Sequence, residues 1–451
     1  MEFLMTKPVT ANRVLISDGA TGMGDFVQEF GFLKTREPDA VATMLAPCSE
    51  ENLEFTILVR VPEFENFLKI AETVAGEIAG LVKKTGEVFV LELDELPLTT
   101  ASKTLLAELI LQQSFEFVKY KSKTKKSGGI FVDFAEKSAE KLHALAGALA
   151  RTKNLVEEPA SVLTPDRFQA LIEEMFADDD AVSIAAIVGE DLEKQGFGGI
   201  RAVGRASKNA PRLVILEYEP ADRTSEDVAV GLVGKGVCFD SGGYNLKPDG
   251  GRTMKSDMGG AATVLGIFKY LVDQNFGKKV VVAVPLVENM IGGDAFKADD
   301  VLKMYKGKTV EIRDTDAEGR LVLADALSFV EEKFKPNFLL DFATLTGAQL
   351  VALGDKIAGI LGRDSAMNQK IQKKSFEILD RVRELPLFEK YFENYKSQTA
   401  DFTNCESGRG NPMTIGAALF LSQFVESKNR AHLDIAGPAR NRSGEGELAT
   451  G

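Results

Sequence analysis

Five short runs of apolar residues, each bounded by turn-forming residues, dominate the chain after about residue 155. Continuous apolar strands have both faces buried, unlike the alternating strands of a sheet with one face in water. Helix-like stretches separate the runs, at about Gly259–Gln274 and Gly319–Phe334. The pattern predicts a mostly parallel or mixed sheet flanked by helices. Its strands are expected at Val182–Val188, Arg212–Tyr218, Val228–Val233, Lys279–Leu286 and Phe338–Ala343.

The N-terminal third also alternates between apolar runs and helix-like stretches, which indicates an α/β domain. The apolar runs are Arg13–Ile16, Leu53–Val61 and Val88–Leu91, and the helix-like stretches are Glu63–Val82 and Lys103–Tyr120.

A polar and apolar repeat from Asp133 to about Leu155 predicts a connecting helix, which Glu157-Glu158-Pro159 closes. A chain of 451 residues exceeds the roughly 250–300 at which a single core stops growing. We therefore predict a protein of the α/β class with two domains. A smaller N-terminal α/β domain, residues 1–154, would precede a larger domain, residues 155–451.

Composition disfavours several classes of protein. No run approaches the ~20 consecutive apolar residues of a membrane span, and Met1–Gly19 does not resemble a secretory signal. Three widely spaced cysteines fit a reducing compartment better than a disulfide framework. The formal net charge of −13 disfavours broad binding to nucleic-acid phosphates, and we interpret the basic run Lys119–Gly129 as a solvated loop. We expect a cytoplasmic protein without membrane or nucleic-acid partners.

Histidine is too scarce for chemistry that needs several imidazoles, since only His143 and His432 occur. His143 lies in an amphipathic run and is expected on the surface of a helix. His432 lies in the strand-like segment Ala431–Ile435 and is expected to pack or to form a hydrogen bond.

Charged residues stand at the carboxyl end of the Val228–Val233 run, where the ligands of such sheets collect. The following segment, Gly234–Pro248, contains Lys235, Asp240 and Lys247 among four glycines, which permit unusual backbone geometry. A glycine-rich loop after a strand can also bind phosphate, but this one matches neither GxGxxG nor the P-loop pattern. A carboxylate in its middle would repel phosphate unless a metal ion intervened.

Two further segments place carboxylates just before predicted helices. Asp257 precedes the helix that begins near Ala261, and Asp316 and Glu318 precede the helix at Gly319–Phe334. Each carboxylate could serve its helix alone, Asp257 as an N-cap and the other two through the helix dipole. Residues at i and i+2 share one side of an extended chain, so Asp316 and Glu318 can converge.

The combination of these segments indicates a metal centre. Four carboxylates cannot gather unneutralised, and two divalent cations would balance the charge of Asp240, Asp257, Asp316 and Glu318. Oxygen ligands suit Mg²⁺ or Mn²⁺, and Zn²⁺ also accepts carboxylates. Lys235 could coordinate Zn²⁺ only as a neutral amine, so its pKa would have to be strongly depressed.

The three segments resemble the signature regions of the leucyl aminopeptidase family, also called cytosol aminopeptidases or peptidase family M17. The likeness extends over roughly residues 150–445 and is most specific in the string Thr315–Leu321. The blocks Phe342–Ala348, Gly416–Leu421 and His432–Gly437 are also similar to the family. The resemblance implies a metal-dependent enzyme that releases the N-terminal residue of a peptide, and it implies a homo-hexamer of two stacked trimers.

By this resemblance, five residues would hold two divalent metal ions. These ions would be Zn²⁺ or Mn²⁺, with Mg²⁺ as an alternative. Asp240 and Glu318 would bridge the two ions. Lys235 and Asp257 would complete the coordination of one ion, and Asp316 that of the other. A bridging water would be acidic enough to supply the attacking hydroxide near neutral pH.

The resemblance also implies catalytic and substrate-binding residues. Lys247 would polarise the scissile carbonyl, and Arg320 would hold a bicarbonate ion as general base. With the local carboxylates on the metal ions, no protein side chain remains to take a proton from the attacking water. Substrate contacts are expected from Met254, Thr344, Leu345 and Gly347. The first three match positions that line the family's first side-chain pocket, which implies a preference for leucine or another apolar first residue.

Other functions remain open at this point. A narrower dipeptidase, such as one acting on Cys-Gly, would use the same centre. A non-catalytic or DNA-binding regulatory protein would keep the fold, although the acidic composition disfavours it.

Several positions depart from the family pattern. Asp314 stands where the family usually has Asn, which adds a charge two residues before Asp316 and could alter metal choice. Ala298-Asp299 replaces a usual Pro-Gly turn. The usual aromatic residue before His432 is missing, and the chain stops at Gly451 where the family normally continues through a closing segment. Stability is the property most exposed to that last difference.

Overall fold

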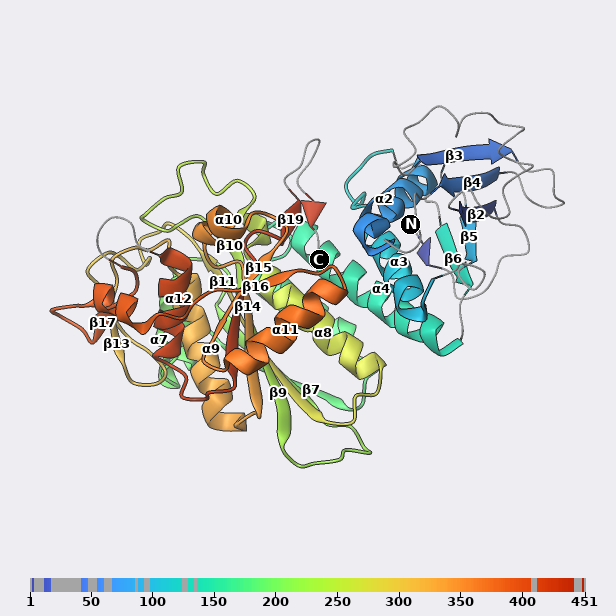
Figure 1. Ribbon diagram of the computed structural model, residues 1–451. Coiled ribbons are helices and arrows are strands. Elements are labelled where there is room, and N and C mark those ends of the chain that lie inside the picture. Colours follow the sequence, from blue (N-terminus) through green and yellow to red (C-terminus); the bar gives the residue numbers. More distant parts are fainter. Residues whose placement is uncertain are drawn as a thin grey trace. The chain divides into compact units, whose positions relative to one another are not determined.

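The chain divides into two compact units, Met1–Ala150 and Arg151–Gly451. The computed structural model describes residues 2–3, 12–17, 42–47, 55–60, 67–85, 88–92, 98–123, 129–133, 136–406, 412–441 and 448–449. Part of the predicted basic loop, residues 124–128, and the last two residues of the chain lie outside this set. Figure 1 shows the arrangement of elements within each unit.

The described part of the first unit contains a sheet in the order β1-β6-β5-β2-β4-β3, in which only the β3–β4 pairing is antiparallel. The strands are β1 (Glu2–Phe3), β2 (Asn12–Ser17), β3 (Ala42–Pro47), β4 (Phe55–Arg60), β5 (Val88–Glu92) and β6 (Gly129–Asp133). The helices are α2 (Phe67–Thr85), α3 (Thr100–Gln113) and α4 (Glu136–Glu157), which runs on into the second unit. The helix predicted up to Tyr120 is wrong at its end, because α3 stops at Gln113.

The second unit is built on a nine-stranded sheet in the order β16-β15-β18-β14-β9-β11-β8-β7, with β10 paired to β11. Pairing is parallel around β9 and β14 and antiparallel at β7, β8 and between β15 and β18, which confirms the predicted mixed sheet. The strands are β7 (Val182–Val188), β8 (Arg212–Tyr218), β9 (Val228–Gly234), β10 (Gly236–Asp240), β11 (Lys279–Asn289), β14 (Phe338–Ala343), β15 (Ala358–Gly362), β16 (Val382–Glu384) and β18 (Arg430–Asp434).

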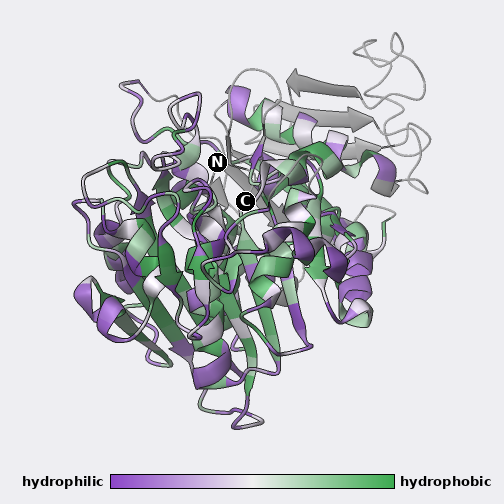
Figure 2. Cartoon of the chain, turned by 90° about the vertical axis from the view of Figure 1, so that its left-hand side faces the viewer, coloured by the Kyte–Doolittle hydropathy of each residue, from purple (hydrophilic) through white to green (hydrophobic). Residues whose placement is uncertain are grey.

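Helices cover both faces of this sheet. Alternate residues of its strands point to opposite faces and therefore pack into two different hydrophobic cores. In β11, Val281 and Ala283 join the core beneath α7 (Gly198–Gly204), α9 (Gly319–Phe334) and α12 (Met413–Ser422). Val280 and Val282 join the core beneath α5 (Pro165–Met175) and α8 (Gly259–Asp273). In Figure 2 the strands of this sheet are mostly green, the colour of hydrophobic residues.

Smaller elements complete the second unit: α6 (Glu190–Lys194), α10 (Gly347–Leu353), α11 (Ser365–Glu377), β12 (Val301–Lys303), β13 (Thr309–Glu311), β17 (Phe402–Thr403), β19 (Arg440–Asn441), β20 (Leu448–Ala449) and the 3₁₀ helices η2 (Met254–Ser256) and η3 (Glu389–Tyr395).

Two expectations about the strands are wrong. The predicted strand Val182–Val188 was expected to be buried on both faces, but it lies at the sheet edge, where Ser183 and Ala185 are exposed. The segment after β9 was expected to be a loop, yet Gly236–Asp240 forms the further strand β10, which pairs with the end of β11. The register against β11 is the same on either side of Lys235, whereas the pairing of β9 with β14 ends at Gly234, so this lysine lies where β14 stops pairing.

Candidate metal centre

Lys235 is fixed at the point where the chain passes from β9 to β10. Its backbone N–H donates to the Phe342 carbonyl at 3.0 Å, and its own carbonyl accepts from Ala261 N–H at 2.8 Å. Two glycines near it leave no room for a Cβ. A Cβ at Gly236 would lie 2.5 Å from the Pro285 carbonyl oxygen, and one at Gly319 would lie 2.5 Å from Lys235 Nζ.

Three predicted ligands converge near this lysine. Asp240 ends β10, and Asp316 and Glu318 precede α9. One carboxylate oxygen of each lies within 4.8 Å of the others. The expectation of an extended chain at Asp316 is wrong, since residues 315–316 form a turn, but the two acids still meet.

Two lysines contact these acids. Lys235 Nζ lies 2.8 Å from Asp257 Oδ2 and 2.9 Å from Glu318 Oε1. Lys247 Nζ lies 2.8 Å from Asp240 Oδ2 and 2.5 Å from Asp316 Oδ1. All five predicted metal-binding residues therefore belong to one cluster, and Lys247 forms salt bridges to two of its acids.

Burial and close packing of like charges shift the pKa values of the acids in this cluster. Burial and the neighbouring carboxylates of Asp240 and Glu318 raise the pKa of Asp316 to about 7. Burial also raises the pKa values of Asp257 and Glu318. Burial alone would lower the pKa of Lys235, but the surrounding carboxylates outweigh it and raise that pKa above its usual range. A neutral Lys235 amine, as metal coordination requires, would need a lowered pKa. The surrounding side chains alone do not lower it.

Asp257 does not cap a helix. Helix α8 begins after Met258 and has no side-chain cap. Instead, Asp257 Oδ1 accepts a hydrogen bond from Thr344 Oγ1 at 2.8 Å, and Oδ2 faces Lys235. The Thr344 carbonyl also accepts from Lys235 Nζ at 3.2 Å. Thr344 therefore holds both members of this ion pair.

A cavity of about 400 Å³ opens on the cluster. Its wall contains every residue predicted for the site: Lys235, Asp240, Lys247, Met254, Asp257, Asp316, Glu318, Arg320, Thr344, Leu345 and Gly347. Asp314 is also in the wall, and its Oδ1 accepts the Asp316 backbone N–H at 2.9 Å. Asp314 is not one of the three converging carboxylates.

Several supporting residues were not predicted. Asn289 Nδ2 donates to Asp240 Oδ1 at 2.8 Å and to the Thr315 carbonyl at 3.0 Å. Thr315 Oγ1 donates to the Gly242 carbonyl at 2.6 Å and accepts the Asn245 N–H at 2.8 Å. These bonds join the loop after β10 to the turn before α9. The position of Asn289 at the carboxyl end of an apolar strand is a signal that could have identified it.

Arg320 turns away from the acid cluster. Its NH1 group donates to the Tyr395 hydroxyl at 3.0 Å and to the Asn404 carbonyl at 2.9 Å. The same group lies 3.7 Å from Glu406 Oε2. These partners lie roughly 75–85 residues along the chain, and no motif in the sequence marks them.

The two histidines lie where they were expected. His143 is exposed on α4. His432 is fully buried in β18, and its Nδ1 shares a hydrogen bond with Asp341 Oδ1 at 2.5 Å. Arg430 NH2 contacts the other oxygen of Asp341 at 3.0 Å, so the charge of this carboxylate is compensated within the core.

The sheet covered on both faces, with clustered carboxylates at its edge, defines an α/β protein with a site suited to divalent cations. The sequence model of the cytosol aminopeptidase family, catalytic domain, matches residues 150–451. The chain belongs to this family, peptidase family M17, and is a metal-dependent aminopeptidase.

Relatives and solved structures agree with this assignment. A probable cytosol aminopeptidase of Azotobacter vinelandii is 36% identical over 397 residues, which cover 85% of this chain and 79% of the relative. The crystal structure of the cytosol aminopeptidase of Coxiella burnetii superposes with a TM-score of 0.85 at 28% identity, over 99% and 96% of the two chains. A bottromycin maturation enzyme, BotP, solved with Mn, gives a TM-score of 0.83 at 32% identity over 98% and 94%.

Proposed function

We propose that this aminopeptidase binds two divalent metal ions through Lys235, Asp240, Asp257, Asp316 and Glu318. The observation that carries the proposal is the convergence of Asp240, Asp316 and Glu318, with ligand oxygens within 4.8 Å of one another. Two lysines offset only part of the charge of four buried or half-buried carboxylates. Cations in the cluster would neutralise the remainder.

The donor atoms fit divalent cations. Among the described residues, none donates a hydrogen bond to the buried oxygen Oε2 of Glu318. Carboxylate oxygens suit Mn²⁺, Mg²⁺ and Zn²⁺, and Zn²⁺ also accepts nitrogen. Mn²⁺ or Zn²⁺ is proposed because a related structure contains Mn and because a neutral Lys235 would suit Zn²⁺. When bound, such ions lower the pKa of a water molecule and polarise a carbonyl group.

Other residues of the cavity would stabilise charge on the substrate and hold the metal ligands in place. Lys247 lies in the cavity wall with 18% of its side chain exposed, so its ammonium group can reach the carbonyl oxygen of a bound peptide. A fixed positive charge there stabilises the negative charge that develops on this oxygen during attack. Thr344 holds Asp257 and Lys235 in place.

The first residue of the peptide would lie against the apolar side of the cavity. Met254 and Leu345 are half-buried in its wall, and Gly347 leaves room beside them. Burial of apolar surface there would favour leucine or another apolar first residue. A bicarbonate base was expected on Arg320, but the carboxylate of Glu406 already lies 3.7 Å from this guanidinium group.

Hydrolysis of leucyl-p-nitroanilide after chelation and readdition of Zn²⁺, Mn²⁺ or Mg²⁺ tests the proposal. We expect activity to return with one of these metals, and calorimetric titration to give two ions per chain. Asp316→Ala should lower both activity and stoichiometry, whereas Asp191→Ala, an exposed carboxylate on α6, should change neither. Activity that survives both chelation and Asp316→Ala would contradict the two-metal centre.

We also propose that residues 155–451 carry the catalysis, that the protein is cytoplasmic, and that it acts on peptides as a homo-hexamer. None of the described helices combines the length and the apolar character needed to cross a bilayer. The net charge of −13 disfavours nucleic acid as a partner. Sedimentation equilibrium of the purified chain, compared with its mass of 48.9 kDa, checks the assembly.

A further inference from the structure

Arg320 has a carboxylate partner within this chain. Its NH1 group lies 3.7 Å from Glu406 Oε2 and donates to the Tyr395 hydroxyl at 3.0 Å. Tyr395 in turn donates its hydroxyl hydrogen to the same oxygen of Glu406 at 2.6 Å. Only 5% of the Arg320 and Glu406 side chains is exposed, so solvent screens their attraction weakly.

The surrounding backbone makes room for this arrangement. A Cβ at Gly416 of α12 would lie 2.5 Å from the Tyr395 hydroxyl and 2.8 Å from Glu406 Oε1. Any side chain at this helical position would therefore displace the pair. Among the described residues, none donates a hydrogen bond to Glu406 Oε1. Within the part of the chain that the structure describes, its polar contacts are with Arg320 and Tyr395.

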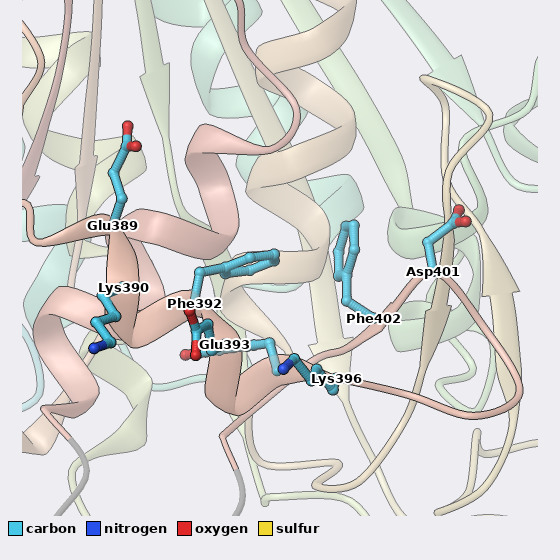
Figure 3. Close-up of a pocket in the computed structure, with 8 residues that line it drawn as sticks. Glu389, Lys390, Phe392, Glu393, Lys396, Asp401 and Phe402 are labelled. Atoms are coloured by element: carbon cyan, nitrogen blue, oxygen red, sulfur yellow. The ribbon is translucent and has the colours of Figure 1, made fainter.

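Aromatic packing fixes the position of the Tyr395 hydroxyl. The Phe392 ring stacks on Tyr395 with a centroid distance of 5.1 Å, and Phe402 meets Phe392 edge-on at 5.3 Å. These rings line a surface hollow of about 450 Å³, in which Figure 3 shows Phe392 and Phe402 side by side. Tyr395 itself is 1% exposed, so it is held between this hollow and the guanidinium of Arg320.

We propose that Glu406 is the resident counter-ion of Arg320 and keeps a second anion, such as bicarbonate, from binding there. The inference rests on the proposed function, because it concerns the same cavity. A guanidinium group alone attracts an anion, but an anion approaching Arg320 here also meets the nearby charge of Glu406. Arg320 and Cys405 line the cavity while Glu406 does not. Glu406 is therefore a positioning residue that acts through Arg320.

The consequence is an enzyme whose activity does not respond to bicarbonate. The test compares the metal-loaded wild type with Glu406→Gln in CO₂-free buffer and in bicarbonate up to about 20 mM, a range wide enough to detect weak binding. Glu393→Gln is the matched control, because it removes the same charge from an exposed position on η3. Binding of ¹³C-labelled bicarbonate, followed by NMR, supplies a readout that does not depend on activity.

We expect bicarbonate to change kcat/KM of the wild type and of Glu393→Gln less than about twofold. Glu406→Gln should bind bicarbonate saturably, at least about tenfold more tightly than the wild type, and its kcat/KM should rise with the same midpoint. Glu406→Asp, which keeps the charge, should remain closer to the wild type. A purely structural role of Glu406 would lower activity without creating this dependence on bicarbonate.

The proposal is overturned if the wild type binds bicarbonate and is activated by it, or if Glu406→Gln folds and binds it no better. If Glu406→Gln does not fold, the wild type and Glu406→Asp still decide the question through bicarbonate binding. A wild type without aminopeptidase activity on any metal would contradict the proposed function instead. The binding experiment would then still test the pairing of Glu406 with Arg320.

Discussion

The hydroxyl group of Thr344 shows how a single residue supports the metal centre without belonging to the acid cluster. Its Oγ1 donates to Asp257 Oδ1 at 2.8 Å, while Asp257 Oδ2 faces Lys235. A hydrogen bond of this kind selects one orientation of a ligand carboxylate before any ion binds. Partners that orient ligands in this way typically contribute about 10–100-fold to metal affinity.

Thr344→Val should therefore weaken metal binding by about 10-fold or more and leave the fold intact. The substitution keeps the shape of the side chain and removes only the donor to Asp257. Competition titration with a metal-sensitive dye measures the affinity, and circular dichroism checks the fold. Thr263→Val on α8 is the control, since its hydroxyl donates to the Gly259 carbonyl of its own helix. Equal affinities for both variants and the wild type would show that Thr344 does not orient Asp257.

Asp314 offers a second prediction at the scale of one residue. Its Oδ1 accepts the Asp316 N–H at 2.9 Å, and the side chain lies in the cavity wall. Asp314→Asn can keep this hydrogen bond while it removes one negative charge two residues from Asp316. We expect a changed order of activation by Zn²⁺, Mn²⁺ and Mg²⁺ with folding intact. An unchanged order would show that the charge of Asp314 does not reach the bound ions.

Asp325 on α9 illustrates a buried acid outside the site. It is fully buried, and its oxygens accept N–H groups of Ile200 and Tyr305 at 3.0 and 2.8 Å. Burial outweighs these donors and raises the pKa of Asp325 to about 7. The folded protein therefore keeps a proton that the unfolded chain releases near pH 4. Its contribution to the free energy of unfolding is greatest below about pH 4 and falls as the pH rises to about 7.

The shift corresponds to about 4 kcal/mol, so the stability of the wild type relative to Asp325→Asn should decline by several kcal/mol between pH 4 and pH 8, about the range in which the acid titrates. The acid cluster also titrates, but it is common to both proteins and cancels in the difference. Calorimetric melting over this range measures the effect. A difference between wild type and variant that stays constant with pH would contradict the raised pKa.

At the scale of elements, the turn before β12 shows why sequence departures matter. Asp299 has a φ of +68°, in the left-handed region that glycine occupies readily. Its N–H donates to the Ile312 carbonyl at 2.7 Å, which fixes this conformation. The Ala298-Asp299 pair thus adopts a conformation that suits the second residue of the Pro-Gly turn that it replaces.

Asp299→Gly should accordingly stabilise the second unit by up to about 1 kcal/mol, because the left-handed conformation carries no Cβ penalty in glycine. Ala298→Gly at the preceding residue, whose φ is not positive, should be destabilising by a similar amount because it only adds freedom to the unfolded chain. Urea unfolding followed by circular dichroism compares the two variants. The same sign of change in both would show that backbone strain at Asp299 is not the cause.

The sequence predicted the elements that present the site better than the contacts that complete it. Strands at Val182–Val188, Arg212–Tyr218 and Phe338–Ala343 have the predicted bounds, because each apolar run ends at a turn residue. The edge position of the first of these and the extra strand β10 were missed, since neither strand order nor register is written in local composition.

In the site, too, the ligand residues could be predicted from the sequence, but several of their contacts could not. Ligand residues at strand ends and helix starts, such as Asp240 and Glu318, could be identified because fold and motif place them at one sheet edge. Glu406 and Asn404 reach Arg320 from a distant segment, and only the folded chain brings them there. The pKa of Lys235 also could not be predicted, because it depends on how closely three carboxylates pack around it.

At the scale of the whole molecule, all five proposed metal ligands lie within Arg151–Gly451, one of the two compact units. A ligand that binds only the folded form stabilises the unit that contains its site, by about 2.7 kcal/mol at a free concentration of 100 times Kd. None of the five proposed ligands belongs to the first unit, so ions at this site would not stabilise that unit directly. The two units should therefore respond differently when the purified protein is loaded with metal.

We predict that scanning calorimetry of the full chain separates a transition that rises by several degrees on addition of Mn²⁺ or Zn²⁺ from one that does not move. A gain of about 2.7 kcal/mol corresponds to a shift of roughly 5 °C for a unit of this size. Asp316→Ala should abolish the shift, and Asp191→Ala should retain it, because Asp191 is an exposed acid on α6 that pairs with Lys194 at 2.8 Å. Equal shifts of all transitions in the wild type would mean that the two units unfold together, and a shift retained by Asp316→Ala would place the stabilising ions elsewhere.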